Sequence, residues 1–170
     1  VAQGCNIIVP VGFNLVDATK TAAAANTGTN FAIVDDDSIQ APNVLGLNYD
    51  TAQAAFLAGY AAAAQSKTGT VATFGGMQIP TVTIFMDGFH DGIKYYNELN
   101  GTDVQLFGWD VDSQKGSFVG NFGDQTKAKQ ITEGFLAQGA DVILPVGGPL
   151  YQGGAEAIKD AGSGAVIIGV

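Results

Sequence analysis

The chain has 170 residues, of which 46% are hydrophobic and 14% charged, and its formal net charge is −9. This length is enough to bury a core, and the hydrophobic fraction excludes a disordered chain. All seven basic residues are lysines, and because arginine is the preferred side chain for phosphate and nucleic-acid contacts, no nucleic-acid partner is expected and a tightly held phosphate is disfavoured.

Short apolar runs alternate with helical patterns along the chain. The runs are near-continuous and rich in valine and isoleucine, which is typical of strands covered on both faces of a parallel sheet. The predicted strands lie at residues 5–12, 30–37, 43–50, 69–77, 102–110, 140–148 and 164–170. Helical patterns fill the gaps at residues 51–66, 81–99, 124–138 and 151–162, and the alanine runs at 22–25 and 61–64 predict close-packed helix surface.

The helix at 81–99 has the clearest periodicity. Phe85, Phe89, Ile93 and Tyr96 recur at i, i+4, i+8 and i+11, which places them on one apolar face. The alternation of strands and helices predicts an α/β fold, with a parallel sheet and helices on both of its faces.

The single cysteine, Cys5, excludes an internal disulfide and a thiolate metal cluster. The small residues before it in "VAQGCN" resemble a bacterial lipoprotein signal, but only four residues precede it, without an apolar signal core. We therefore expect Cys5 to be buried or half-buried, as free cysteines usually are. The chain starts without Met and stops within the strand-like "AVIIGV", so we interpret it as an internal piece of a longer protein.

Glycines and polar residues follow several predicted strands, in "PVGF", "VDDDS", "GGMQIP", "GWDVD" and "PVGGPLYQGG". Ligands of parallel α/β sheets collect at these carboxyl ends. The last segment lacks the Lys-Ser/Thr ending of a nucleotide-binding loop and the spacing of a dinucleotide fingerprint. Its glycines permit either a bare strand-to-helix turn or the approach of the backbone to a ligand, and the sequence leaves both open.

Residues capable of catalysis are few. His90 is the only histidine, which argues against a zinc site and a serine-hydrolase triad, and we expect it to be a solvated surface residue. The carboxylates of "VDDDS" and "GWDVDS" could hold Mg²⁺ and accept a phosphoryl group, but no late strand ends in the lysine that phospho-receiver domains need. We expect no catalytic residue, no metal and no cofactor, and a receiver-like or phosphohydrolase-like enzyme stays open only as an alternative.

Four segments resemble the basic membrane protein family, the substrate-binding lipoproteins of nucleoside ABC importers, which include purine-nucleoside receptor lipoproteins. They are "FAIVDDDS", the long stretch from "NVLGLNYD" to "DGIKYYN", "GNFGDQTKAKQ" and "GADVILPVGG". The match runs in order over nearly the whole chain, and "FLAGYAAAAQSKTGTVATFGGMQIP" is its most specific part. Two departures are modest: a Ser often precedes the Phe of "GNFGD", and relatives carry a shorter Ala/Gly run at "PVGGPLYQGG", a difference that could alter which ligand fits.

The resemblance implies a periplasmic-binding-protein fold of type I, with residues 1–48 belonging to the first lobe and residues 49–170 forming the second. The chain is then a fragment of a two-lobed protein. The resemblance also implies ligand-binding positions: Asp35 as the acceptor of ligand hydrogen bonds, Phe122 as a base-stacking aromatic, and Gly148 at the sugar with Gly147 beside it. Phe13, at the end of the first predicted strand, is a weaker candidate for the ligand cleft.

The function implied by the resemblance is that of an extracytoplasmic solute-binding protein, membrane-anchored as a lipoprotein or periplasmic. It would bind a small molecule, with a nucleoside expected, and pass it to an ABC permease. A ligand-sensing regulator on the same fold and a binder of a sugar or another small solute are the alternatives.

Overall fold

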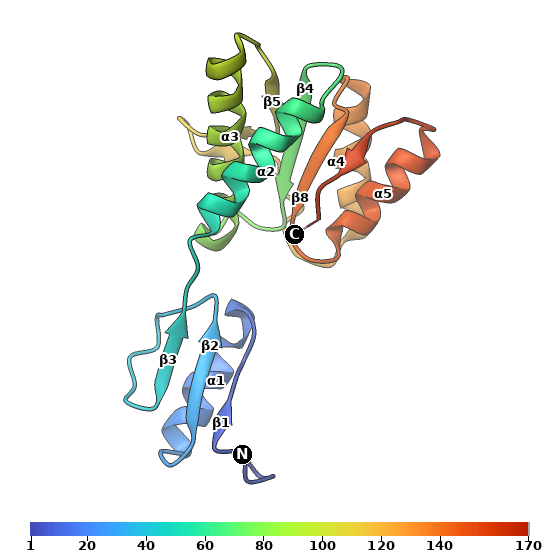
Figure 1. The fold of residues 1–170 in the computed structure, drawn as a ribbon. Coiled ribbons are helices and arrows are strands. Elements are labelled where there is room, and N and C mark those ends of the chain that lie inside the picture. Colours follow the sequence, from blue (N-terminus) through green and yellow to red (C-terminus); the bar gives the residue numbers. More distant parts are fainter. Residues whose placement is uncertain (170) are drawn as a thin grey trace. The chain divides into compact units, whose positions relative to one another are not determined.

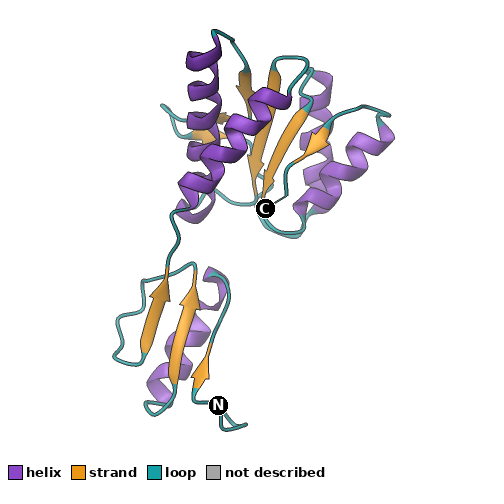
Figure 2. Ribbon diagram, in the orientation of Figure 1, coloured by secondary structure: helices purple, strands orange, loops and turns teal. Residues whose placement is uncertain are grey.

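The computed structural model describes residues 1–169, so Val170, the end of the last predicted strand, lies outside the described residues. The chain divides into two compact units, Val1–Asp50 and a second unit that begins at Thr51. Each unit combines parallel strands with helices (Figures 1 and 2). No helix within residues 1–169 is long and apolar enough to cross a bilayer.

The first unit is a three-stranded parallel sheet in the order β1-β2-β3. Its elements are β1 (Ile7–Ile8), the 3₁₀ helix η1 (Phe13–Leu15), α1 (Val16–Ala25), β2 (Asn30–Val34) and β3 (Val44–Leu47). Helix α1 follows the 3₁₀ turn directly and lies along the sheet (Figure 1).

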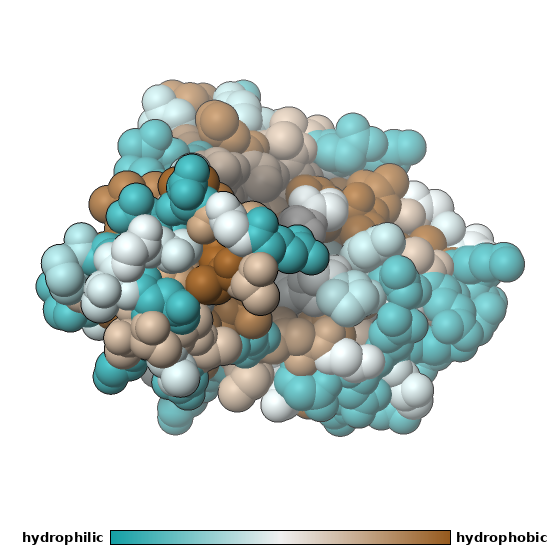
Figure 3. All heavy atoms as spheres, turned by 90° about the horizontal axis from the view of Figure 1, so that it is seen from below, coloured by the Kyte–Doolittle hydropathy of each residue, from teal (hydrophilic) through white to brown (hydrophobic). Residues whose placement is uncertain are grey.

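The two faces of this first sheet differ in burial. Phe31 and Ile33 of β2 are 3% and 0% exposed. Successive side chains of a strand point to opposite faces, and the residues paired in register, such as Ala32 with Leu45, share a face. Val11, which bridges Val34, and Leu45 lie on this second face and are 68% and 62% exposed. In the view from below, apolar residues lie among hydrophilic ones on the surface of the chain (Figure 3). Helix α1 thus covers one face, whereas the sequence predicts cover on both.

The second unit is built on a four-stranded parallel sheet in the order β5-β4-β8-β9. Its strands are β4 (Thr70–Gly75), β5 (Gln105–Phe107), β8 (Val142–Val146) and β9 (Val166–Ile167). Its helices are α2 (Thr51–Gln65), α3 (Pro80–Asn100), α4 (Gln125–Ala137) and α5 (Leu150–Asp160). The seven predicted strands and four predicted helices of the chain are all present, which confirms the α/β fold.

Helices cover both faces of the central strands β4 and β8. Val71 and Val142 belong to an apolar cluster with residues of α2 and α3. Their chain neighbours Ala72 and Ile143 belong to a second cluster with residues of α4 and α5. Because side chains alternate along a strand, the near-continuous apolar runs fill both clusters at once. The predicted cover on both faces is confirmed for this sheet.

Helix α3 has the predicted apolar face. Phe89 and Ile93 are 0% and 3% exposed, and Phe85 and Tyr96 are partly buried against the same cluster. The helix begins with Pro80, whose fixed φ suits the first turn. It ends at Asn100 and is followed by Gly101, whose φ of 63° is the left-handed conformation of a typical C-terminal cap.

Two local features, a hairpin and the position of the cysteine, also differ from the prediction. A short antiparallel hairpin, β6 (Trp109–Asp110) with β7 (Lys115–Gly116), follows β5 and was not predicted. Cys5 is exposed, so the prediction of a buried or half-buried thiol is wrong. The reason is that β1 begins at Ile7 and has only two residues, so Cys5 precedes the hydrogen-bonded ladder.

Asp141 ties the start of β8 to the turn between α2 and β4. One carboxylate oxygen accepts a hydrogen bond from Ser66 Oγ at 2.6 Å, and the other accepts from the N–H groups of Lys67 and Thr68 at 2.6 and 3.0 Å. Burial alone would raise the pKa of Asp141, but these hydrogen bonds together hold it below its ordinary value. The carboxylate therefore stabilises the fold in its charged form.

We expect Asp141→Asn to lower the free energy of unfolding by about 1–2 kcal/mol at pH 7, because charge-assisted hydrogen bonds are lost. Since the folded-state pKa is depressed, the stabilisation is present above the unfolded-state pKa and is lost as the pH falls through the folded-state pKa. Urea unfolding at pH 7 and pH 3 measures both effects. Glu133→Gln, at an exposed position of α4, is the control and should change the free energy of unfolding little. An equal effect of both variants would contradict the stabilising role of the Asp141 hydrogen bonds.

Candidate functional site

The carboxyl end of β4 is extended by a loop that comes from the region after the β6–β7 hairpin. Gly75 N–H donates to the carbonyl of Ser117 at 3.0 Å, and Val119 N–H donates back to the carbonyl of Gly75 at 3.0 Å. Gly120 N–H then donates to the carbonyl of Gly76 at 2.8 Å. These backbone bonds lay the loop alongside β4 in a parallel bridge.

The far end of the same loop is fixed by side chains. Asn121 Oδ1 accepts hydrogen bonds from the N–H groups of Gly123 and Asp124, both at 2.8 Å. Asp124 caps α4 by accepting from Lys127 N–H at 2.9 Å. Phe122 lies between these two anchors, so its backbone is held from both sides.

Phe122 packs on glycine backbone at the ends of β4 and β8. A Cβ atom placed on Gly76 would lie 2.3 Å from Phe122 Cδ1, and one placed on Gly147 would lie 3.1 Å from the same atom. The side chain of Phe122 is partly buried. It packs against the apolar cluster that β4 and β8 form with α2 and α3. The structure therefore brings two of the predicted site residues, Phe122 and Gly147, into direct contact.

Gly148 lies next to this contact and is exposed. Its φ of 47° is in the left-handed region, and a Cβ atom there would meet nothing within 4 Å. Gly148 thus adopts the left-handed conformation that the turn from β8 into α5 requires, and it leaves its backbone accessible to a ligand.

The remaining two predicted residues lie together in the first unit. Gly12 N–H donates to the carbonyl of Val34 at 3.1 Å, so Phe13 and Asp35, the next residue of each segment, follow this bond at the carboxyl ends of β1 and β2. Asp35 is exposed and has a φ of 64°, a conformation that aspartate tolerates better than most residues. Its N–H donates to the carbonyl of Leu47 at 3.0 Å, which fixes the backbone of this turn.

The other two aspartates of "VDDDS" lie in the loop after Asp35. Asp36 Oδ1 accepts from Ser38 N–H at 2.9 Å and from Ser38 Oγ at 2.7 Å, which forms a local turn. Asp37 has an exposed side chain. Asp36 is therefore engaged in shaping the loop.

The chain matches one protein family along its whole length. The family model described as "Bmp: ABC transporter substrate-binding protein PnrA-like" matches residues 1–170. The chain belongs to the Bmp family. This confirms the resemblance to the basic membrane proteins that the sequence segments indicated.

Two relatives of the Bmp chain come from Borreliella burgdorferi and Lactococcus lactis. Basic membrane protein D of Borreliella burgdorferi is 34% identical, over 97% of this chain and 46% of the relative. The "ABC transporter nucleoside-binding protein BmpA" of Lactococcus lactis is 32% identical, over 89% of this chain and 40% of the relative. The chain spans less than half the length of each of these two proteins.

A solved structure shares the fold. The ABC transporter system solute-binding protein from Aeropyrum pernix K1 superposes with a TM-score of 0.81 and 28% sequence identity, covering 99% of this chain and 46% of the other. This similarity, with the parallel sheets described above, confirms the periplasmic-binding-protein-like fold and a match to about half of a two-lobed protein.

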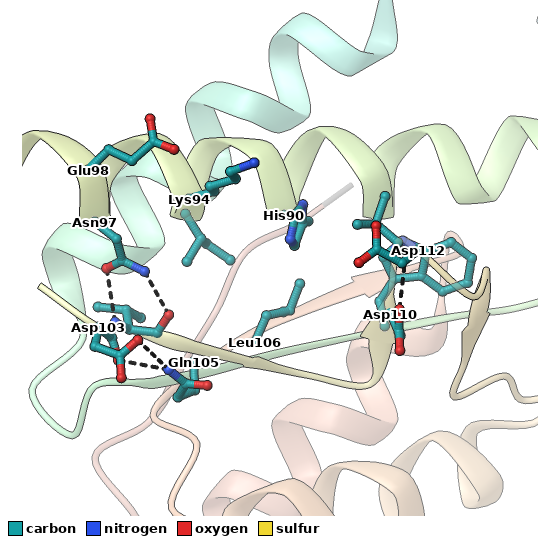
Figure 4. Close-up of a pocket in the computed structure, with 13 residues that line it drawn as sticks. His90, Lys94, Asn97, Glu98, Asp103, Gln105, Leu106, Asp110 and Asp112 are labelled. Atoms are coloured by element: carbon teal, nitrogen blue, oxygen red, sulfur yellow. Dashed lines mark hydrogen bonds between the residues drawn. The ribbon is translucent and has the colours of Figure 1, made fainter.

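A polar groove of about 480 Å³ lies on the second unit between α3 and the strands β5 and β6 (Figure 4). Asn97 Nδ2 donates to the carbonyl of Val104 at 2.9 Å, and Asp110 accepts from the N–H groups of Ser113 and Asp112 at 3.0 Å. The hydrogen bonds from Ser113 are the main cause that holds the pKa of Asp110 below its ordinary value. These polar groups stabilise the turns around β5 and β6.

His90 lines this groove, with its side chain 29% exposed and Nδ1 3.1 Å from Asp91 Oδ1. It is thus a partly covered surface residue, where the sequence predicts a solvated surface histidine. Within residues 1–169 no three His, Cys, Asp or Glu side chains are grouped so that they could hold a metal ion.

Sequence reasoning did not single out Gly76 or the loop at residues 117–120. The double glycine of "GGMQIP" was recognised only as part of a strand end, although two successive glycines after a buried strand are a signal of close backbone contact. The loop has no such local signal, because its partner strand lies about forty residues earlier in the chain.

Proposed function

We propose that this chain is part of an extracytoplasmic solute-binding protein that binds a nucleoside and passes it to an ABC permease, without chemical conversion. The observation that carries the proposal is the ring of Phe122, partly buried on the glycines at the carboxyl ends of β4 and β8, in a chain of the Bmp family. The name of the Lactococcus lactis relative supports a nucleoside as the ligand. The protein would be periplasmic or anchored to the membrane as a lipoprotein.

Each proposed site residue offers a contact that suits a nucleoside. The flat face of Phe122 would stack on the base, which needs an apolar partner rather than a charge. Asp35 would accept hydrogen bonds from ligand O–H or N–H groups. Gly147 and Gly148 would bring backbone close to the sugar, and Phe13 would add apolar surface. In this proposal residues 1–48 belong to the first lobe of a two-lobed protein and residues 49–170 to the second.

A thermal-shift screen of the full-length protein tests this function. Nucleosides, free bases, ribose and other sugars would each be added at the same concentration, and a ligand that binds only the folded state raises the melting temperature. We expect nucleosides to raise it and ribose alone to have little effect. A shift with sugars and none with nucleosides would overturn the assignment of the ligand.

We expect Asp35→Ala to weaken nucleoside binding by about 2 kcal/mol or more, because a charge-assisted hydrogen bond is lost. Asp37→Ala is the matched control, since Asp37 is an exposed aspartate of the same loop. The affinity of this variant for the nucleoside should stay near that of the wild type. Titration calorimetry on both folded variants gives the comparison. Equal losses, or Mg²⁺ binding that Asp35→Ala abolishes, would refute this role of Asp35.

A further inference from the structure

Gly76 is a buried glycine whose backbone does not require glycine. It follows the last residue of β4 directly, and its φ lies outside the left-handed region that favours glycine. The φ angle of Gly76 therefore gives no reason for a glycine at this position. The reason for glycine must therefore be sought in what packs against its Cα.

The ring of Phe122 occupies the space that a side chain of residue 76 would fill. A Cβ atom on Gly76 would lie 2.3 Å from Cδ1 and 2.4 Å from Cε1 of Phe122, and 3.1 Å from the carbonyl oxygen of Asn121. The first two distances are far below van der Waals contact. One edge of the ring thus rests directly on the backbone of Gly76.

The backbone of Gly76 has no freedom to retreat from the ring. Its N–H donates to the carbonyl of Val146 at 2.9 Å, and its carbonyl accepts from Gly120 N–H at 2.8 Å. The first bond ties it to β8 and the second ties it to the loop that carries Phe122. An added Cβ atom would therefore have to displace the ring rather than the glycine.

We propose that Gly76 is a positioning residue that sets the plane of the Phe122 ring, and that it thereby makes the site selective for ligands with a flat aromatic base. This inference rests on the proposed function of Phe122. Gly147 bounds the ring from the side of β8. With both glycines in place the ring keeps one orientation, which lowers the ordering cost of stacking a base on it.

The test is a double-mutant cycle in the full-length protein with a nucleoside that binds the wild type. We expect Gly76→Ala to weaken nucleoside binding about tenfold in titration calorimetry. The small change in melting temperature that ribose causes should be the same as in the wild type. In the Phe122→Ala background the same change should have almost no effect on affinity, because the ring that it would displace is gone. Unchanged affinity of a folded Gly76→Ala protein, or an equal loss in both backgrounds, would overturn the proposal.

Two further comparisons keep the outcome clear. If no nucleoside binds the wild type, the proposed function fails; if the wild type binds and the cycle shows no coupling, only the role of Gly76 fails. If Gly76→Ala does not fold, its effect is measured in the Phe122→Leu background, where the smaller, flexible side chain leaves room for a Cβ atom. Equal melting temperatures with and without Gly76→Ala in that background would support the proposal, and a large drop would overturn it.

Discussion

Replacing Phe122 by alanine is expected to weaken nucleoside binding by about 1–3 kcal/mol, roughly 5- to 150-fold, because this is the usual contribution of stacking one base on an aromatic ring. Phe122→Tyr should keep most of the affinity, because the flat face of the ring is what the base needs. Titration calorimetry with the same nucleoside measures the three affinities in the full-length protein.

Phe118 supplies the control from the same loop. It is partly buried, like Phe122, and its ring meets that of Trp109 edge-to-face at a centroid distance of 6.0 Å. Phe118→Ala should lower the melting temperature because a packed ring is lost, yet leave the affinity of the folded protein close to that of the wild type. Equal affinity losses for the two variants would mean that Phe122 acts through folding alone.

Replacing Gly92 by alanine is expected to destabilise the second unit by about 3 kcal/mol, which is a large share of the stability of an ordinary domain. A Cβ atom on Gly92 would lie 2.0 Å from the carbonyl oxygen of Phe56 and 2.7 Å from the backbone nitrogen of Tyr60. Gly59 is equally close to α3, since its Cβ atom would lie 2.0 Å from the carbonyl oxygen of Phe89. Helices α2 and α3 therefore cross in backbone contact, and a methyl group must force them apart.

The measurement for Gly92→Ala is urea unfolding followed by the fluorescence of Trp109, the single tryptophan, which is buried in the second unit. Gly134→Ala is the matched control, because Gly134 lies in α4 with nothing within 4 Å of an added Cβ atom. Alanine there should stabilise the helix by roughly 0.5–1 kcal/mol. If the urea midpoint of Gly92→Ala equals that of the wild type, helices α2 and α3 can move apart without cost, and their close contact does not contribute to stability.

The sequence by itself determined the order and type of most elements, although not the β6–β7 hairpin. The apolar runs at 69–77 and 140–148 become β4 and β8, and the spacing of Phe85, Phe89, Ile93 and Tyr96 predicts the buried face of α3. This works because side-chain direction repeats every two residues in a strand and every 3.6 in a helix, so burial leaves a local pattern. The segments that resemble the basic membrane proteins also indicated the family before any contact was known.

Only the tertiary structure decided which backbones touch. The placement of Phe122 on Gly76 depends on a loop that pairs with β4 from about forty residues further along the chain. The crossing of α2 and α3 at Gly59 and Gly92, and the exposed face of the first sheet, likewise follow from packing between distant segments. In the sequence, a glycine that allows a tight turn looks the same as a glycine that leaves room for a neighbouring ring. Local sequence cannot separate these causes, because the contact that distinguishes them forms only when the elements pack.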